Sequence, residues 1–319
     1  MSKKPRSRVR DLAEYAAVRT IETLFSLLPT RVGLWFGRRL GSLFRLVDRG
    51  HRNIAEQNVA MGLALTPHEA RQLVRKMFRN LGATFVEGLM LPAILRRSHP
   101  DDFAHLEGAE HLTAALAQGR GAIIVTAHMG NWEMGCLPAS KVAGSMMAIA
   151  RPMRNPLLDR NARKLRATLG TTIVDRQGAM RHVLRHLHNG GLVAMLIDQN
   201  QRSGGVFVDF FGKLASTVPT PASIALKYNV PVLAACTWRD DDGFHHHFHC
   251  DPPFELIRTG NHKADVVANT AMFTKRIEEY IRRHPDQWFW LHQRWRKRPP
   301  EELEAQNQRP VTDPSQEKP

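Results

Sequence analysis

Apolar residues recur at helical spacing through the first hundred residues, and the stretch contains no run that is typical of a strand. Thr66 and Pro67 form a pair that commonly begins a helix, with Thr66 as the cap and Pro67 in the first turn. Glu69 completes a capping box with Thr66. The pattern predicts a helical region over residues 1–100.

The pattern changes near residue 122, where short apolar runs begin to alternate with helical stretches of about a dozen residues. The runs lie at residues 123–126, 146–150, 171–174, 192–197 and 230–235. Such alternation predicts an α/β domain over residues 101–298, with a mainly parallel central sheet flanked by helices.

Three later segments complete the predicted domain. Residues 206–211 form a two-sided apolar run that predicts a hairpin or an ordered flap, and residues 244–250 alternate like an edge or antiparallel strand. Residues 264–283 predict a closing helix. The polar residues 299–319 are expected to form a disordered tail.

Composition narrows the class of partner. The formal net charge of +15 predicts attraction to nucleic acid, to an anionic membrane leaflet, or to an acidic protein or phosphorylated substrate. Three scattered cysteines without a CxxC pair favour a reducing compartment and give no zinc signal.

The N-terminal fifty residues are basic and amphipathic. Asp11, Glu14 and Glu22 break up any apolar core of a signal peptide, so no cleaved signal is expected, and no run approaches the roughly 20 apolar residues that span a bilayer. In residues 12–47, Leu, Phe and Trp are interleaved with Arg. This fits a helix pair in the lipid headgroup region, or two ordinary amphipathic helices packed on the domain.

The most informative segment is residues 123–135, IIVTAHMGNWEMG, which predicts a buried strand, a turn, and a helix that Asn131 caps. On one continuous helix, His128 and Glu133 would lie about 140° apart and could not pair. If His128 lies in the turn, its ring can reach Glu133. A histidine oriented by a carboxylate suits acyl transfer to a hydroxyl, because imidazole takes the proton and the carboxylate stabilises the imidazolium. The alternative is a loop histidine near a surface glutamate.

Several motifs in order give this chain a family resemblance over most of residues 40–298. They are Arg52-Asn53 with Asn58, AHMGNWE (127–133), RPMRNPLLD (151–159), Asp175-Arg176, IDQN (197–200), FVDFFG (207–212), Ser216-Thr217 and PDQWFWLHQRWRKRP (285–299). The chain thereby resembles the lipid A biosynthesis lauroyl/myristoyl acyltransferases, within a wider group that shares an H-x4-D/E motif.

The resemblance implies that His128 and Glu133 are the catalytic pair. It also implies that Arg151 lies near the reacting carbonyl or a substrate phosphate, where a guanidinium suits an oxyanion. Asp198, with Gln199, ends another strand on the same expected edge and is a candidate for positioning substrate or holding the loop. A basic patch is assigned as a whole to anion binding, through Arg154, Arg163, Lys164 and Arg176.

The implied reaction moves a fatty acyl chain from acyl carrier protein, or from coenzyme A, to a hydroxyl of a lipid A precursor. The resemblance implies no metal and no cofactor beyond the acyl donor, and it implies an anionic membrane surface at the cytoplasmic face of the inner membrane. A different lipid acceptor, such as a lysophospholipid, ornithine lipid or glycolipid, is an alternative. IDQN stands where the glycerolipid branch has an FPEGTRS-like motif, which favours the lipid A branch.

A basic nucleic-acid-binding protein is the alternative from another class, but no nucleic-acid partner is expected. Trp288, Phe289, Trp290 and Trp295 are interpreted as packing or interface residues rather than a base-stacking platform. His245, His247 and His249 share one face of a predicted strand, but residues two apart rarely converge on one tetrahedral ion. No G-x-S-x-G or Walker A motif is present.

Overall fold

The structure is a computed structural model, and it describes residues 7–302. The helical N-terminal region is confirmed, and its helices are α1 (Arg8–Leu27), α2 (Thr30–Val47), α3 (Arg49–Leu63) and α4 (Pro67–Arg97). The Thr66 and Glu69 capping box that begins α4 is present, with the Thr66 backbone N–H 2.9 Å from the Glu69 carboxylate. Most of the predicted polar tail, residues 303–319, lies outside the described residues.

The predicted α/β architecture is also confirmed, because a seven-stranded sheet forms the centre of the chain. Its strands are β1 (Ala104–Glu107), β2 (Ala122–Thr126), β3 (Met146–Ala150), β4 (Thr171–Asp175), β5 (Leu192–Leu196), β8 (Val232–Arg239) and β9 (His246–Cys250). They lie in the order β1-β9-β8-β2-β5-β3-β4. The five strands from β8 to β4 are parallel.

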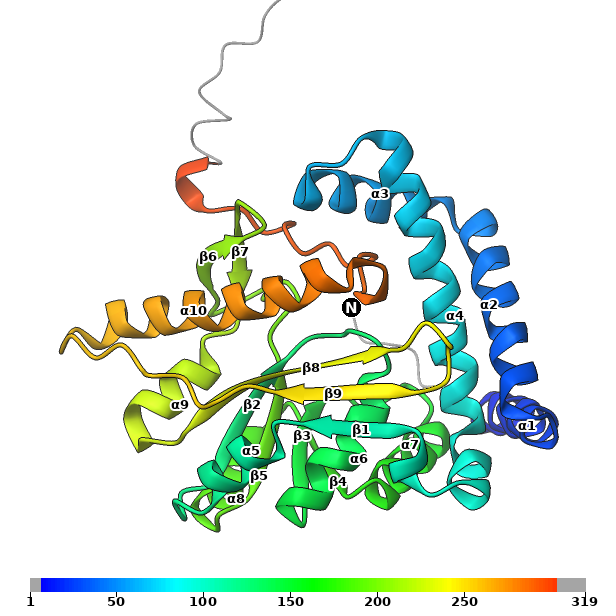
Figure 1. The fold of residues 1–319 in the computed structure, drawn as a ribbon, viewed down its shortest axis with the longest axis horizontal. Helices are drawn as coiled ribbons and strands as arrows, with labels where there is room; N and C mark the ends of the chain where they lie inside the picture. Colours follow the sequence, from blue (N-terminus) through cyan, green and yellow to red (C-terminus); the bar gives the residue numbers. More distant parts are fainter. Residues whose placement is uncertain (1–6, 303–319) are drawn as a thin grey trace, which may run out of the picture.

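Helices cover both faces of this sheet (Figure 1). They are α5 (Ala109–Leu116), α6 (Trp132–Ala143), α7 (Pro156–Thr168), α8 (Ala179–His188), α9 (Thr220–Tyr228) and α10 (His262–Arg283), with short 3-10 turns η1 (Pro100–Asp102) and η2 (Pro285–Gln287). In β2, Ile123 and Val125 face a core shared with α8, α9 and α10, whereas Ile124 faces a core shared with α5 and α6. Strand alternation therefore divides the apolar interior into two layers.

The sheet has a mixed edge that periodicity predicts only in part. Strand β9 is antiparallel to β8, as expected from its alternating pattern, but β1 pairs with β9 in parallel and forms the edge instead. The four residues of β1 were not predicted as a strand. Their pattern of one buried residue among exposed and half-buried ones is too short to show a period of two.

The predicted hairpin at residues 206–211 is present as β6 (Val206–Phe210) and β7 (Lys213–Thr217), which pair with each other outside the main sheet. Phe211 lies in the turn between them with a φ of 58°. The C-terminal segment passes over this hairpin, and Trp295 stacks on Phe210 at 5.9 Å between ring centroids. Trp288, Trp290 and Trp295 are buried, so the interpretation of these aromatic residues as packing residues is confirmed.

Helix α2 packs on α4 through its smallest residues. It lies on the side of α4 away from the sheet (Figure 1), and it buries Gly33, Gly37 and Gly41. A Cβ on Gly41 would lie 1.9 Å from the Phe78 carbonyl oxygen, so only glycine permits this approach. Leu34 is buried with these glycines. Most of the large apolar residues of α2 are exposed instead, and they are Val32, Trp35, Phe36, Leu40, Leu43, Phe44, Leu46 and Val47.

Candidate active site at the carboxyl edge of the sheet

His128 lies in the turn after β2, at the carboxyl edge of the parallel strands. In the pairing of β2 with β5, Thr126 lies opposite Leu196, and continuing that register by two residues places His128 opposite Asp198. The His128 ring donates from Nδ1 to Asp198 Oδ1 at 2.9 Å, and the His128 backbone N–H donates to Oδ2 at 2.9 Å. One carboxylate thus fixes both the ring and the backbone of the histidine.

The His128 turn is also fixed by the segment that follows α10. The Phe289 backbone N–H donates to the His128 carbonyl at 3.1 Å, and the Gly130 N–H donates to the Gln287 carbonyl at 2.9 Å. Gly130 has a φ of 56°, and a Cβ there would lie 2.4 Å from the Thr237 carbonyl oxygen. Glycine is therefore required for this turn to fit against β8.

Charge at the site favours a protonatable histidine beside a permanent carboxylate. Burial alone would lower the pKa of His128, but the charge and hydrogen bond of Asp198 outweigh burial and raise it. Burial alone would raise the pKa of Asp198, but His128 and the Trp288 indole N–H lower it to about 2. Asp198 is 3% exposed, and Trp288 Nε1 donates to its Oδ2 at 2.8 Å.

The carboxylate that contacts His128 is therefore Asp198, and the predicted contact with Glu133 is wrong. Glu133 is the second residue of α6, and its carboxylate binds the Arg166 guanidinium of α7, with Arg166 Nε 2.8 Å from Oε2. A bidentate guanidinium is a stronger partner than a histidine already bonded elsewhere. Glu133 still acts on His128 through its charge, which adds to the rise in the His128 pKa. A catalytic role for Glu133 stays a prediction.

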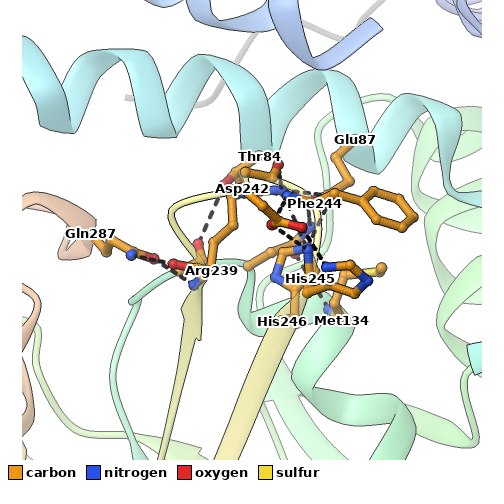
Figure 2. A network of polar contacts seen from close by, with 12 residues as sticks. Thr84, Glu87, Met134, Arg239, Asp242, Phe244, His245, His246 and Gln287 are labelled. Carbon is orange, nitrogen blue, oxygen red and sulfur yellow. Dashed lines mark hydrogen bonds and ion pairs between the residues drawn. The ribbon is translucent and has the colours of Figure 1, made fainter. Parts of the chain in front are cut away.

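Asn131 caps the start of helix α6, as predicted, because its side chain accepts the Met134 backbone N–H at 3.3 Å. The other end of the Asn131 amide donates to Glu87 of α4 at 2.6 Å. Glu87 is fully buried and is the anion of a network in which Arg239 and His246 reach it from β8 and β9 (Figure 2). The network ties the start of α6 to α4 and to the ends of two strands.

The remaining predicted site residues lie farther along the same edge. Arg151 directly follows β3, which is separated from β2 by β5, and its side chain is exposed. Of the predicted anion patch, Arg154, Lys164 and Arg176 are exposed, whereas Arg163 is bound to Asp159, Asp175 and the Ile173 carbonyl. Arg163 is thus mainly a structural residue that joins α7 to β4.

Two hollows lie near these residues. A cavity of about 10 Å³ beside the His128 ring is lined by α4, Trp132 and residues 287–289, and it has room for about one water molecule. Trp132 stands edge-on to the His128 ring at 5.2 Å between centroids. A wider open depression of about 540 Å³ lies on α7, with Met153, Pro156 and Ala167 in its lining and Arg160 and Lys164 beside them.

The histidines of β9 bind carboxylates. His247 lies between Glu107 at 3.1 Å and Asp240 at 2.9 Å, and His249 lies between Glu107 at 3.3 Å and Asp251 at 3.1 Å. Within residues 7–302, no group of three or more His, Cys, Asp or Glu side chains is arranged to hold a metal ion. No described helix is long and apolar enough to cross a membrane.

Sequence reasoning placed Asp198 at the right edge, but it missed Trp288 as part of the site and did not predict that Arg166, a residue of the basic helix, binds Glu133. Both act through contacts between residues distant in the chain, and an indole N–H leaves no local signal of its partner. Gln199 was named as a candidate, and its side-chain nitrogen lies 3.4 Å from His128 Nε2. It is therefore the polar side chain that covers the ring nitrogen not engaged by Asp198.

Comparison with known proteins confirms the family resemblance. Residues 2–297 match the family model described as bacterial lipid A biosynthesis acyltransferase. The lipid A biosynthesis palmitoleoyltransferase of Escherichia coli is 28% identical over 283 residues, which cover 86% of this chain and 89% of that protein.

Two mycobacterial proteins act on a different lipid. A phosphatidylinositol mannoside acyltransferase of Mycobacterium tuberculosis strain H37Rv is 27% identical over 245 residues, 75% of each chain. That of strain CDC 1551 is 27% identical over 192 residues, and the match spans 59% of this chain and 58% of that protein. The chain is thus about equally identical to enzymes whose names give different lipid acceptors. Sequence identity therefore does not distinguish between these acceptors.

Proposed function

The chain belongs to the bacterial lipid A biosynthesis acyltransferase family, and from that premise we propose that it moves a fatty acyl chain from a thioester donor to a hydroxyl of a lipid A precursor, with His128 as general base. The observation that carries this proposal is the His128 and Asp198 pair at the carboxyl edge of the sheet. Ligands of open α/β sheets bind outside that edge.

The proposed reaction proceeds in two proton transfers. His128 Nε2 takes the proton of the acceptor hydroxyl as its oxygen forms a bond to the thioester carbonyl carbon. The tetrahedral intermediate then breaks its C–S bond, and the leaving thiolate takes the proton from the His128 imidazolium. Asp198 stabilises that imidazolium and remains ionised, because its pKa is about 2. The products are an ester and a thiol.

The remaining site residues supply hydrogen bonds and charge around this step. Gln199 lies beside the His128 ring nitrogen that receives the proton, where its amide can bind the acceptor hydroxyl or the acyl carbonyl. Glu133, through its charge, favours the imidazolium, and its carboxylate binds Arg166 of α7. Arg151 is proposed to bind the oxyanion or a substrate phosphate from the end of β3.

The basic depression on α7 is proposed to receive the anionic part of a substrate. Arg160 and Lys164 are exposed there beside apolar Met153, which is 45% exposed. A surface that joins cations to apolar side chains fits a phosphorylated lipid, and it also fits the acidic acyl carrier protein that we propose as donor. The phosphorylated disaccharide of a lipid A precursor is favoured over a neutral glycolipid by this charge.

Helices α1 and α2 are proposed to hold the enzyme on an anionic membrane surface at the cytoplasmic face of the inner membrane. Helix α2 buries three glycines and Leu34, and it exposes Trp35, Phe36 and Leu43, which are 49%, 44% and 56% exposed. A helix that merely packs on a soluble domain buries most of its large apolar residues, so the exposure of these side chains favours the interfacial alternative. Arg31 and Arg39 lie among these apolar residues and suit anionic headgroups.

The proposed function is tested by incubating the purified protein with an acyl donor and an acceptor, followed by mass spectrometry of the lipid. The donors are acyl carrier protein and coenzyme A charged with the same chain. The acceptors are a bisphosphorylated, acylated glucosamine disaccharide and a phosphatidylinositol mannoside. We expect one added acyl chain on the disaccharide, and none with His128→Ala. Acylation of the mannoside alone would refute the acceptor, and a lack of product with every pair would refute the function.

A further inference from the structure

Three side chains of the C-terminal segment bind three consecutive residues after β5. Trp288 Nε1 donates to the Asp198 carboxylate at 2.8 Å, and the Asn200 backbone N–H donates to His292 Nε2 at 2.8 Å. Arg294 donates to the Gln199 carbonyl at 3.3 Å. We refer to Trp288, His292 and Arg294 as the C-terminal clamp.

The clamp acts where the sheet no longer fixes the backbone. The Ile197 N–H donates to the Thr126 carbonyl, which continues the ladder of β2 and β5 past its end, and the Gln201 N–H donates to the Ser216 carbonyl of β7. Residues 198–200 lie between these two bonds. Their orientation therefore depends on the side chains that reach them, and Asp198 is the residue that orients His128.

Arg294 is the most unusual member of the clamp. Its side chain is fully buried, and its acceptors are the carbonyls of Gln199 and Ser216 and the hydroxyl of Thr217, all of them neutral. Burial lowers the pKa of Arg294 to about 10, and the charge of Asp198 opposes that effect. A buried cation among neutral acceptors is costly, so a residue that served packing alone would be better replaced by an apolar one.

His292 completes the electrostatic arrangement. Burial lowers the pKa of His292, and although the charge of Asp198 opposes this effect, the positive charge of Arg294 adds to it, so the pKa of His292 lies below its ordinary value. A neutral imidazole keeps Nε2 as an acceptor, and the Asn200 N–H requires an acceptor at that position. Arg294 therefore helps to hold His292 in the form that binds the turn.

We propose that Trp288, His292 and Arg294 are positioning residues, which hold the turn at residues 198–200 so that the Asp198 carboxylate meets both the ring and the backbone of His128. They act on catalysis through Asp198 and do not touch the substrate. The proposal rests on the proposed function, since it needs His128 to be the base. It assigns the C-terminal aromatic segment a part in the site beyond packing.

The test compares two buried tryptophans of the same segment. Trp288→Phe removes the indole N–H that binds Asp198, whereas Trp290→Phe removes one that binds the Pro285 carbonyl at 2.7 Å. Trp288 is 1% exposed and Trp290 is 0% exposed, so both substitutions cost packing. For Trp288→Phe we expect kcat to fall about tenfold or more, with KM little changed. The acid limb of kcat/KM is expected to move to lower pH, because an Asp198 carboxylate that is no longer held against His128 raises the pKa of His128 less. Trp290→Phe is expected to keep the wild-type pH profile.

Arg294→Lys provides a second variant in case Trp288→Phe does not fold. Lysine keeps the positive charge but replaces the guanidinium fork by one ammonium group, so the Gln199, Ser216 and Thr217 contacts cannot all be kept. We expect a fall in kcat with KM little changed. Arg296→Lys is the control, because the Arg296 side chain binds the nearby Gln293 side chain at the surface.

The outcomes separate the clamp from the proposed function. If the wild-type enzyme transfers no acyl chain, the proposed function fails. If the wild-type enzyme is active but Trp288→Phe and Arg294→Lys match their controls in kcat and in pH profile, the clamp alone is refuted. Equal losses in Trp288→Phe and Trp290→Phe, with unchanged pH profiles, would also refute it, because they would indicate a packing role.

Discussion

Asp198 accepts two hydrogen bonds from His128, one from ring Nδ1 and one from the backbone N–H, each at 2.9 Å. The two residues lie two positions beyond the paired Thr126 and Leu196, so the parallel register of β2 and β5 continues into the site. This relationship fixes the tautomer of His128, because a donating Nδ1 leaves Nε2 as the acceptor. It identifies the ring nitrogen that takes the proton in the proposed reaction.

The first prediction concerns pH. His128 must be neutral to act as a base, and Asp198 raises its pKa above the ordinary value near 6.5. We therefore expect kcat/KM to fall as the pH drops through a value above 6.5. Asp198→Asn removes the charge that raises this pKa, so the acid limb is expected to move to lower pH while kcat falls by about a hundredfold or more. Steady-state rates from pH 5 to pH 9 measure both effects.

A second prediction distinguishes the two carboxylates near His128. Glu133→Gln breaks the ion pair with Arg166 but leaves the His128 and Asp198 bonds in place. We expect activity to fall with a smaller movement of the acid limb than in Asp198→Asn, because Asp198 has the larger effect on the pKa of His128. If the acid limb moved further in Glu133→Gln than in Asp198→Asn, Glu133 and not Asp198 would be the carboxylate that orients His128. Circular dichroism of both variants controls for unfolding.

The third prediction concerns stability. Glu87 is fully buried and binds Arg239, His246 and Asn131. Glu87→Gln leaves the Arg239 guanidinium buried without its counter-charge, which is expected to cost about 3–5 kcal/mol of the free energy of unfolding. Removing both charges with Glu87→Gln and Arg239→Met together is expected to recover part of that loss. Urea unfolding measures it, and a double variant less stable than Glu87→Gln would contradict the explanation.

A fourth prediction links His247 to the pH dependence of stability. Burial alone would lower the pKa of His247, but its bonds to Asp240 and Glu107 raise it. A folded-state pKa above the unfolded value means that the imidazolium stabilises the fold fully below about pH 6.5. The contribution is lost as the pH rises through the folded-state pKa. The melting temperature of wild type should therefore exceed that of His247→Gln more at pH 6 than at pH 9.

The fifth prediction concerns the outward face of α2. Replacing Trp35, Leu40 and Leu43 by serine removes large exposed apolar side chains without touching the glycine contacts with α4. We expect binding to anionic phospholipid vesicles to weaken about tenfold or more, because each side chain stabilises insertion by about 1–3 kcal/mol. Met180→Ser on α8 is the control, since Met180 is 44% exposed on another surface. If the serine variant sedimented with vesicles as the wild type does, the exposed face of α2 would not be needed for membrane binding.

The sequence by itself determined most of the elements, although not β1, and the position of His128. Residues 123–135 carry a buried strand, a turn and an Asn131 cap within thirteen consecutive residues, and each of these is a local property of the chain. The order of strands along the chain also determined a mainly parallel sheet, because helical connections between strands require it.

The tertiary structure alone decided which carboxylate meets His128. Asp198 lies seventy residues away, and it reaches the histidine because β5 is the neighbour of β2 in the sheet order. Glu133 is five residues away but begins a helix that turns its carboxylate toward Arg166 of α7. Periodicity records which side of an element is buried, but it does not record which element lies beside it, so contacts between distant strands and helices require the assembled fold.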